Sequence, residues 1–367
     1  MRIAEIAPPW VKVPPERYGG IEWIVSLLTD GLVQRGHHLT LYAPANSTTK
    51  GELRAPFDEA VELGGMDFYS AVHPMAVQSV APFLQAERYD IIHDHTGPIA
   101  ACLGAFSDTP VLHTLHGPFN PDVKHLFSMI KDRIYFNSIS EAQRSGFPHL
   151  NYIGTIYNAV ELSSYPFRSE KEDYALFLGR FTKDKGAHNA IYIAQKAGVP
   201  LRMAGKVDPG EDSRYFEERI EPHLDGEHIV FEGEVGGEQK RKLLSGARFL
   251  LFPIQWEEPF GLVMTEALAC GTPVVATAMG SAPEIVKDGE VGILRPPYRW
   301  EEMVAAIRGG SLEEIDPYRC REVVRERFSV EAMVDGYEKA FEKILALEKA
   351  QGTRRHRLER TGTLQER

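Results

Sequence analysis

Short apolar runs alternate with longer amphipathic segments along most of the 367-residue chain. This alternation is typical of βα units that build parallel sheets covered by helices. The first run, Arg2–Ala7, predicts a strand, and the pattern over Ile21–Gln34 predicts the helix that follows. Further strands are predicted at His38–Ala43, Tyr89–His93, Pro110–Leu115, Ile134–Ile139 and Tyr152–Ile156. The stretch 45–85 fits neither pattern, so no element is predicted there.

A second series of the same kind follows the polar stretch Leu162–Asp173, which indicates an interdomain linker. Its predicted strands are Tyr174–Leu178, Leu201–Ala204, Ile229–Glu232, Phe249–Pro253, Pro273–Ala276 and Gly292–Leu294. Its predicted helices are His188–Ala197, Arg214–His223, Glu238–Ser245, a helix that starts near Phe260 and runs to Ala269, and Val330–Lys349. Two such halves predict two α/β domains that face a cleft, with ligands beyond the carboxyl ends of the strands. The expected boundaries are 1–162, 172–329, a last helix over 330–350 and a basic tail over 351–367.

Composition limits the classes of binding partner and the cellular compartments that are expected for this protein. A formal net charge of −11 argues against general nucleic-acid binding. No apolar run reaches the ~20 residues of a transmembrane helix, and an acid interrupts the short N-terminal run, so no signal peptide is expected. Three widely spaced cysteines argue for the reducing cytoplasm, against disulfides and against a cysteine zinc site. The C-terminal arginines lie among polar residues, which favours a solvated tail over a membrane- or partner-binding patch.

A glycine pair lies between the first strand and the first helix, in Tyr18-Gly19-Gly20-Ile21-Glu22. Glycines let the backbone approach a ligand, and a helix start offers free N–H groups, so this is a natural seat for a diphosphate. On this motif alone, a glycine turn that serves only chain geometry is the favoured interpretation. It is not G-x-G-x-x-G, which counts against a nicotinamide dehydrogenase. The long loop before it, Pro8–Arg17, is expected to shape an acceptor site.

Two cations and two carboxylates follow strands of the second half. Arg180 and Lys185 come directly after the strand Tyr174–Leu178, where they could grip a leaving diphosphate or form an ordinary solvated loop. Glu258 precedes the helix near Phe260, and Glu266 falls inside its apolar run, where a buried carboxylate needs a partner. Carboxylates accept hydroxyl hydrogen bonds, so this pair favours binding of ribose and sugar hydroxyls over a plain helix boundary.

Histidines mark the ends of two strands in the first half. His116 ends the strand Pro110–Leu115 and could hydrogen-bond a sugar or stabilise charge, although a histidine satisfied by backbone groups is an equally good interpretation. His93 and His95, with Asp94 between them, share one strand face in the manner of a metal site. No third-ligand spacing such as H-E-x-x-H accompanies them, so structural roles are favoured and no metal site is predicted.

Taken together, these residues resemble glycosyltransferase family 4, whose members are retaining enzymes with the two-domain GT-B fold. The likeness extends to about residue 345. Its segments are the glycine pair, His93-Asp94-His95, Leu115-His116-Gly117, Asn158–Leu162, Gly179–Phe181 with Lys185-Gly186, Glu257–Leu262, Glu266-Ala267, Ala269–Ala276 and Pro283–Gly289. The separation of Glu258 and Glu266 matches the E-x7-E signature of the family.

The resemblance implies a role for each motif residue. Gly19 and Gly20 would approach the diphosphate of a UDP- or GDP-sugar, and Arg180 with Lys185 would neutralise it. Glu258 would bind the transferred sugar, Glu266 the ribose, and His116 would lie at the reacting sugar. Backbone N–H groups would come from Phe260, Gly261 and Leu262. The last helix would cross back to the first domain.

The implied reaction is front-face transfer with retention, in which the leaving diphosphate accepts the proton of the acceptor hydroxyl. No cofactor or divalent ion is expected. The helix Ile21–Gln34 carries no Lys or Arg, which favours a small soluble acceptor over a lipid. The alternatives are a nucleotide-sugar epimerase or hydrolase on the same fold and a non-catalytic nucleotide-sugar-binding protein. The sequence defines neither the donor base and sugar nor the oligomeric state.

Overall fold

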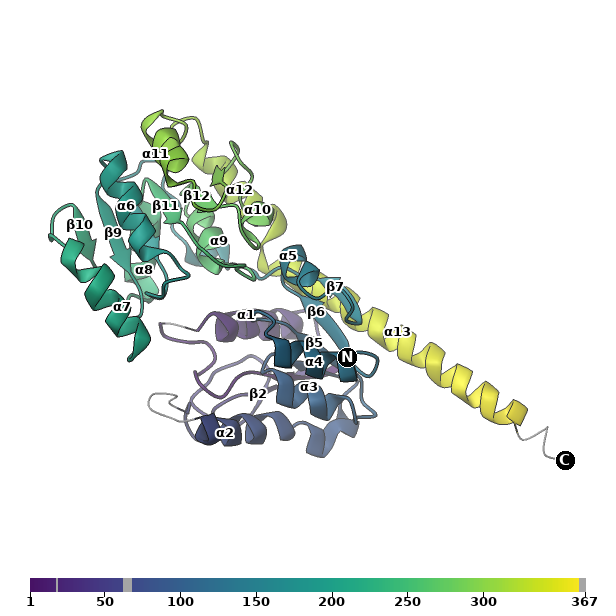
Figure 1. Cartoon of the computed structure of the whole chain (residues 1–367). Helices are drawn as coiled ribbons and strands as arrows, with labels where there is room; N and C mark the ends of the chain where they lie inside the picture. Colours follow the sequence, from purple (N-terminus) through teal and green to yellow (C-terminus); the bar gives the residue numbers. More distant parts are fainter. Residues whose placement is uncertain (18, 62–67, 363–367) are drawn as a thin grey trace.

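The first domain, the lower body in Figure 1, is built on a seven-stranded parallel sheet in the order β3-β2-β1-β4-β5-β6-β7. The computed structural model describes residues 1–17, 19–61 and 68–362. The strands are β1 Arg2–Ile6, β2 His38–Tyr42, β3 Glu52–Arg54, β4 Ile91–Asp94, β5 Val111–Thr114, β6 Tyr135–Ser138 and β7 Tyr152–Thr155. Every strand predicted for this half is present, and β3 adds a strand in the stretch 45–85, where none was predicted.

Helices cover both faces of this sheet. Neighbouring residues of β1 enter different cores: Ile3 packs with α1, whereas Ala4 packs with α3 and α4. This alternation is the period of two that a strand imposes on its side chains. The helices are α1 Gly20–Gln34, α2 Phe68–Val80, α3 Pro98–Gly104, α4 Pro121–Ile130 and α5 Glu141–Ser145, with a 3-10 helix at Phe83–Arg88.

The second domain has a six-stranded parallel sheet in the order β10-β9-β8-β11-β12-β13 and a single continuous core. Its strands are β8 Ala175–Leu178, β9 Leu201–Ala204, β10 Ile229–Phe231, β11 Phe249–Phe252, β12 Val274–Thr277 and β13 Gly292–Arg295. Its helices are α6 Ala187–Ala197, α7 Glu211–Arg219, α8 Gly237–Gly246, α9 Leu262–Ala269, α10 Ala282–Ile285, α11 Trp300–Arg308 and α12 Pro317–Arg327. The architecture is therefore the two-domain α/β fold that the sequence predicts.

Two helices differ from the sequence prediction in their bounds. The helix expected near Phe260 begins at Leu262, because Gly261 precedes it in the left-handed conformation, with φ of 76°. The helix expected over Arg214–His223 is α7 followed by the 3-10 turn Glu221–His223, since Pro222 has no N–H to continue an α-helix.

The predicted linker is anchored to the second domain and is not a free tether. It opens with a 3-10 turn over Leu162–Ser164. Further on, Lys171 Nζ donates to the carbonyls of Ser245 and Cys270 and to Thr272 Oγ1 at 3.1, 3.0 and 2.9 Å. Burial of this ammonium group lowers the pKa of Lys171 to about 8. The sequence pattern predicts that Lys171 lies in a solvated linker, but its hydrogen bonds instead anchor the start of the second domain.

The last helix, α13, spans Val330–Gly362 and returns along the first domain (Figure 1). Tyr337, Phe341 and Ile344 are fully buried in the core that α1 shares with the first sheet. Gly31 of α1 leaves room for Val334, because a Cβ on Gly31 would lie 2.5 Å from Val334 Cγ2. Beyond residue 350 the helix continues into the predicted basic tail, whose arginine side chains and residues 363–367 lie outside the described part. Among the described helices, none has an apolar stretch long enough to span a bilayer.

Candidate active site

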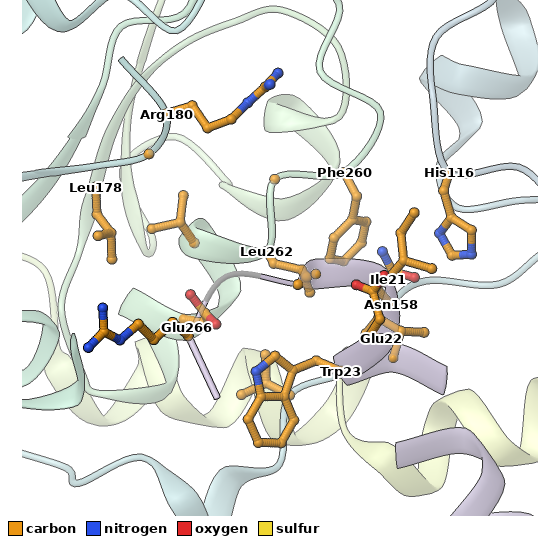
Figure 2. Close-up of a pocket in the computed structure, with 18 of the residues that line it drawn as sticks. Ile21, Glu22, Trp23, His116, Asn158, Leu178, Arg180, Phe260, Leu262 and Glu266 are labelled. Atoms are coloured by element: carbon orange, nitrogen blue, oxygen red, sulfur yellow. The ribbon is translucent and has the colours of Figure 1, made fainter. Parts of the chain in front are cut away.

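A cleft of about 860 Å³ lies between the two domains (Figure 2). Both domains contribute its walls, and the ends of the parallel strands open into it, as ligand sites do in such sheets. The cleft is lined by every residue that the sequence singles out for the site: Gly19, Gly20, His116, Arg180, Lys185, Glu258, Phe260, Gly261, Leu262 and Glu266. Tyr18 of the glycine motif lies outside the described residues.

Two helix N-termini meet across this cleft. Gly20 begins α1 of the first domain, and Leu262 begins α9 of the second. They approach so closely that a Cβ on Gly20 would lie 3.3 Å from Leu262 Cδ1. Gly19, with φ of 148°, adopts a backbone conformation that other residues rarely reach. Since each N-terminus presents free N–H groups and the positive end of a helix dipole, the space between them attracts an anion.

The cations of the second domain are held differently from one another. Lys185 forms an ion pair with Glu258 Oε2, and its Nζ lies 4.7 Å from the centre of the Trp256 ring. Trp256 Nε1 also donates to Glu258 Oε2, at 3.1 Å. A guanidinium nitrogen of Arg180, Nη1, is 3.8 Å from Asp208 Oδ2, and 41% of the Arg180 side chain is exposed. Arg180 is therefore the cation with more freedom to turn toward a ligand.

Glu266 is buried and has two partners that the sequence prediction missed. Tyr165 from the linker donates to Glu266 Oε1 at 2.7 Å, and Lys240 from α8 does so at 2.6 Å. Burial and the adjacent carboxylate raise the pKa of the Tyr165 hydroxyl, so it stays a donor. Both contacts join segments far apart in the chain, which is why spacing alone could not reveal them. These two donors hold the Glu266 carboxylate in place at the wall of the cleft (Figure 2).

His116 follows β5 and is half-buried at the wall of the cleft. Its Nε2 is 2.7 Å from Nδ1 of His95, a buried residue after β4. Burial and the neighbouring histidines lower the pKa of His116 well below its usual value, so its imidazole is neutral at pH 7. His93 and His95, for which the sequence favours structural roles, both contact the buried carboxylate of Glu5 in β1.

Two further residues of the cleft carry no role in the sequence prediction. Glu22, in the first turn of α1, is 5% exposed, and burial raises the pKa of its carboxyl to about 7. Asn158, at the domain junction, is buried, and its Oδ1 has no hydrogen-bond partner among the described residues. An acid in a first helical turn usually faces solvent, so the sequence carries no sign that Glu22 is desolvated.

Both halves of the chain match known sequence families. Residues 18–150 match the family described as Glycosyltransferase Family 4, and residues 163–327 match the one described as Glycosyl transferases group 1. The chain belongs to glycosyltransferase family 4. This glycosyltransferase is 24% identical over 381 residues to glycogen synthase of Mycobacterium tuberculosis, covering 90% of each chain. It is 26% identical over 356 residues to phosphatidyl-myo-inositol mannosyltransferase of Mycobacterium leprae, covering 86% of this chain and 89% of that relative.

Solved structures share the GT-B architecture of the glycosyltransferase. AviGT4, a glycosyltransferase involved in avilamycin A biosynthesis, superposes with a TM-score of 0.69 at 26% identity, covering 94% of this chain and 98% of its own. Sucrose-phosphate synthase from Thermosynechococcus elongatus gives 0.78 at 20% identity, covering 95% and 100%. HepE of Anabaena, solved with UDP and glucose, gives 0.72 at 17% identity, covering 94% and 100%.

Proposed function

We propose that this glycosyltransferase moves the sugar of a UDP- or GDP-sugar to a hydroxyl of a small soluble acceptor, with retention and without a metal ion. The observation that carries the proposal is that two helix N-termini, the cations Arg180 and Lys185, and the carboxylates Glu258 and Glu266 all line one cleft. Each of these groups matches one part of a nucleotide-diphosphate sugar: the phosphates, the ribose and the sugar hydroxyls.

The diphosphate would lie between the N-termini of α1 and α9, within reach of Arg180 and Lys185. As the glycosidic bond breaks, negative charge builds on the leaving phosphate, so these groups act chiefly in the transition state. Cations and N–H groups then take the place of the divalent ion that many nucleotide enzymes use. Binding of phosphate by Lys185 would also release Glu258 toward the sugar, since the two side chains form an ion pair with each other.

Retention by front-face attack is supported by the state of Glu258. Its Oε2 accepts from Trp256 Nε1 as well as from Lys185, so this oxygen keeps a donor even after Lys185 turns to the phosphate, which suits a hydrogen-bonding carboxylate better than a nucleophile. In the proposed reaction the acceptor hydroxyl attacks from the side of the departing phosphate. The leaving diphosphate takes the proton of that hydroxyl, so no protein base is required.

The acceptor would enter along the first domain. Trp10 and Val11 of the loop Pro8–Arg17 line the cleft, as does Trp23 of α1, which is 39% exposed. α1 carries no Lys or Arg for anionic lipid heads, which supports a small soluble acceptor. The three cysteines form no disulfide, which fits the cytoplasmic location expected from the sequence.

A thermal-shift screen against UDP, GDP, ADP and their common sugars, with and without EDTA, tests the donor assignment. A ligand at 100 times its dissociation constant stabilises the fold by about 2.7 kcal/mol, so the true donor should stand out. The proposal expects an EDTA-insensitive shift with a uridine or guanosine diphosphate. A shift that needs metal, or none with any nucleotide, would overturn it. The variant Lys240→Met, which removes a partner of Glu266, should reduce the shift more than Lys339→Met on α13.

A further inference from the structure

A chain of hydrogen bonds runs from the interior of the first domain to the cleft. Glu5 Oε1 lies 2.6 Å from His95 Nε2, and His95 Nδ1 lies 2.7 Å from His116 Nε2. Glu5 and His95 have fully buried side chains, and Glu5 comes from β1, the strand beside β4. The chain therefore links a carboxylate in the centre of the sheet to the one histidine of this series that lines the cleft.

The charge of Glu5 fixes the direction of this chain. Burial alone would oppose ionisation, but the contacts with His93 and His95 lower the pKa of Glu5 to about 2, so it is a carboxylate that only accepts. A neutral His95 must place its single proton on Nε2, toward Glu5, and its Nδ1 then accepts from His116 Nε2–H. His116 is left with a bare Nδ1.

The other branch of the network agrees with this assignment. Asn137 Nδ2 donates to the Tyr337 hydroxyl at 3.2 Å, and that hydroxyl lies 3.1 Å from Thr114 Oγ1. Thr114 Oγ1 lies 2.8 Å from His93 Nε2, whose Nδ1 is 3.0 Å from Glu5 Oε1. If each hydroxyl donates to the next acceptor, His93 carries its proton on Nδ1 and donates it to Glu5. Each contact along the two branches then holds one proton, with all imidazoles neutral, and the 3.3 Å between His93 Nδ1 and His95 Nε2 separates two donors that share Glu5 Oε1.

A metal ion would explain the same cluster less well. Glu5, His93 and His95 offer three ligand atoms within 4.8 Å of one another. Zinc bonds of about 2.0–2.1 Å at tetrahedral angles keep ligand atoms roughly 3.3 Å apart. His93 Nδ1 and His95 Nε2 are 3.3 Å apart, but the distances from Glu5 Oε1, 2.6 Å to His95 and 3.0 Å to His93, are those of hydrogen bonds.

We infer that Glu5 and His95 are positioning residues that hold His116 as the Nε2–H tautomer, so that its Nδ1 accepts a hydroxyl of the transferred sugar. This inference rests on the proposed transfer reaction for its kinetic consequences, but the tautomer exists without it. No proton is transferred along the chain. The buried negative charge of Glu5 polarises both imidazoles toward the sugar, where positive charge develops as the glycosidic bond breaks.

The direct test is the tautomer of His116 in the whole protein. Long-range proton–nitrogen NMR spectra of protein labelled with ¹⁵N-histidine, recorded at about pH 8, distinguish the two ring nitrogens. Signals are assigned with the variants His116→Gln and His95→Gln. The expected result is a proton on Nε2 of both His116 and His95. A proton on Nδ1 of His116 would overturn the inference, whether or not sugar transfer is observed. That result would mean that His95 is cationic or that the cluster binds a metal ion.

The kinetic test compares Glu5→Gln with the wild type once a donor is known. Removing a charge-assisted hydrogen bond should lower kcat by roughly 10- to 100-fold with little change in KM for the donor. Loss of the negative charge also makes the His116 cation less stable, so the acid limb of the kcat–pH profile should move to lower pH. A merely structural Glu5 would lower activity without moving that limb, and this outcome would contradict the inference.

The remaining titratable groups near His116 must be separated from this effect. His93 and His95 lie on the β4 side, His113 is paired with Asp94 at 2.5 Å, and Glu22 in α1 titrates in the same cleft. If the acid limb of the kcat–pH profile reflects ionisation of Glu22, that limb disappears in the variant Glu22→Gln. The matched control is Thr114→Val, which removes an equally buried partner of His93. It should lower stability and leave the acid limb in place, and a limb that moves equally would count against the chain through His95.

Discussion

Replacing Glu22 with glutamine should stabilise the glycosyltransferase at neutral pH. Glu22 is 5% exposed, and burial raises the pKa of its carboxyl from 4.5 to about 7. Each pKa unit corresponds to about 1.4 kcal/mol, so this difference amounts to about 3 kcal/mol. Because the folded-state pKa is raised, the unfolded chain releases its proton first as the pH rises. The contribution of Glu22 to stability is thus fully present below pH 4.5 and is lost by about pH 7.

Glutamine keeps the shape of the side chain and cannot ionise. Relative to the wild type, Glu22→Gln should gain little at pH 4.5 and up to about 3 kcal/mol of unfolding free energy above pH 7. The lost attraction between the carboxylate and the N-terminus of α1 would reduce this gain by about 0.3–1 kcal/mol. Urea denaturation of both proteins at pH 4.5, at about 6 and at about 8 measures the difference.

Glu302→Gln is the matched control, because Glu302 also lies in a first helical turn, that of α11, but is exposed. Its effect should stay within about 0.5 kcal/mol at each pH. A Glu22→Gln difference that does not change with pH, or a loss of stability above pH 7, would refute the desolvation argument. A gain as predicted would mean that the cleft holds a costly acid, as binding sites do when a group is retained for function.

Three other predictions concern single contacts. Arg180→Ala should lower kcat by roughly 10²-fold in a steady-state assay, because the leaving phosphate loses a cation. Arg202 of β9 is paired with Glu232, and Arg202→Ala should leave kcat unchanged. Tyr165→Phe should weaken nucleotide binding by up to about tenfold in calorimetry, since Glu266 loses one donor, and unaltered affinity would argue against Glu266 as a ligand. Gly31→Ala should cost about 1–3 kcal/mol in denaturation, because its Cβ would collide with Val334, and adding Val334→Ala should restore most of the loss.

The strands and the positions of the site residues could be predicted because they depend on local pattern. Most of the strands are runs of mainly apolar residues, and the functional groups of a parallel α/β protein gather where such runs end. β3 was missed because it is a three-residue edge strand with partly exposed side chains. α3 and α5 have only seven and five residues, too few for a helical period to show. α2 contains Pro74, which a sequence reading treats as a helix breaker.

The interior contacts of the site could not be predicted, because they join residues that only the folded sheets bring together. Glu5 reads as an acid that interrupts an apolar run, yet it is fully buried because β4 places His93 and His95 against it. Tyr165 reads as part of a linker, and only the docking of that segment on the second domain brings its hydroxyl to Glu266. Sequence reasoning thus located the groups that face the cleft and missed the groups that hold them in place.

Proton NMR of the first glycoside formed tests the central claim most directly. The donor is the one identified by the thermal-shift screen, the reaction contains excess EDTA, and the coupling constant of the anomeric proton reports the configuration. The account predicts a product with the same anomeric configuration as the donor, formed at the same rate with and without the chelator. An inverted product, or transfer that stops when metal is removed, would contradict it.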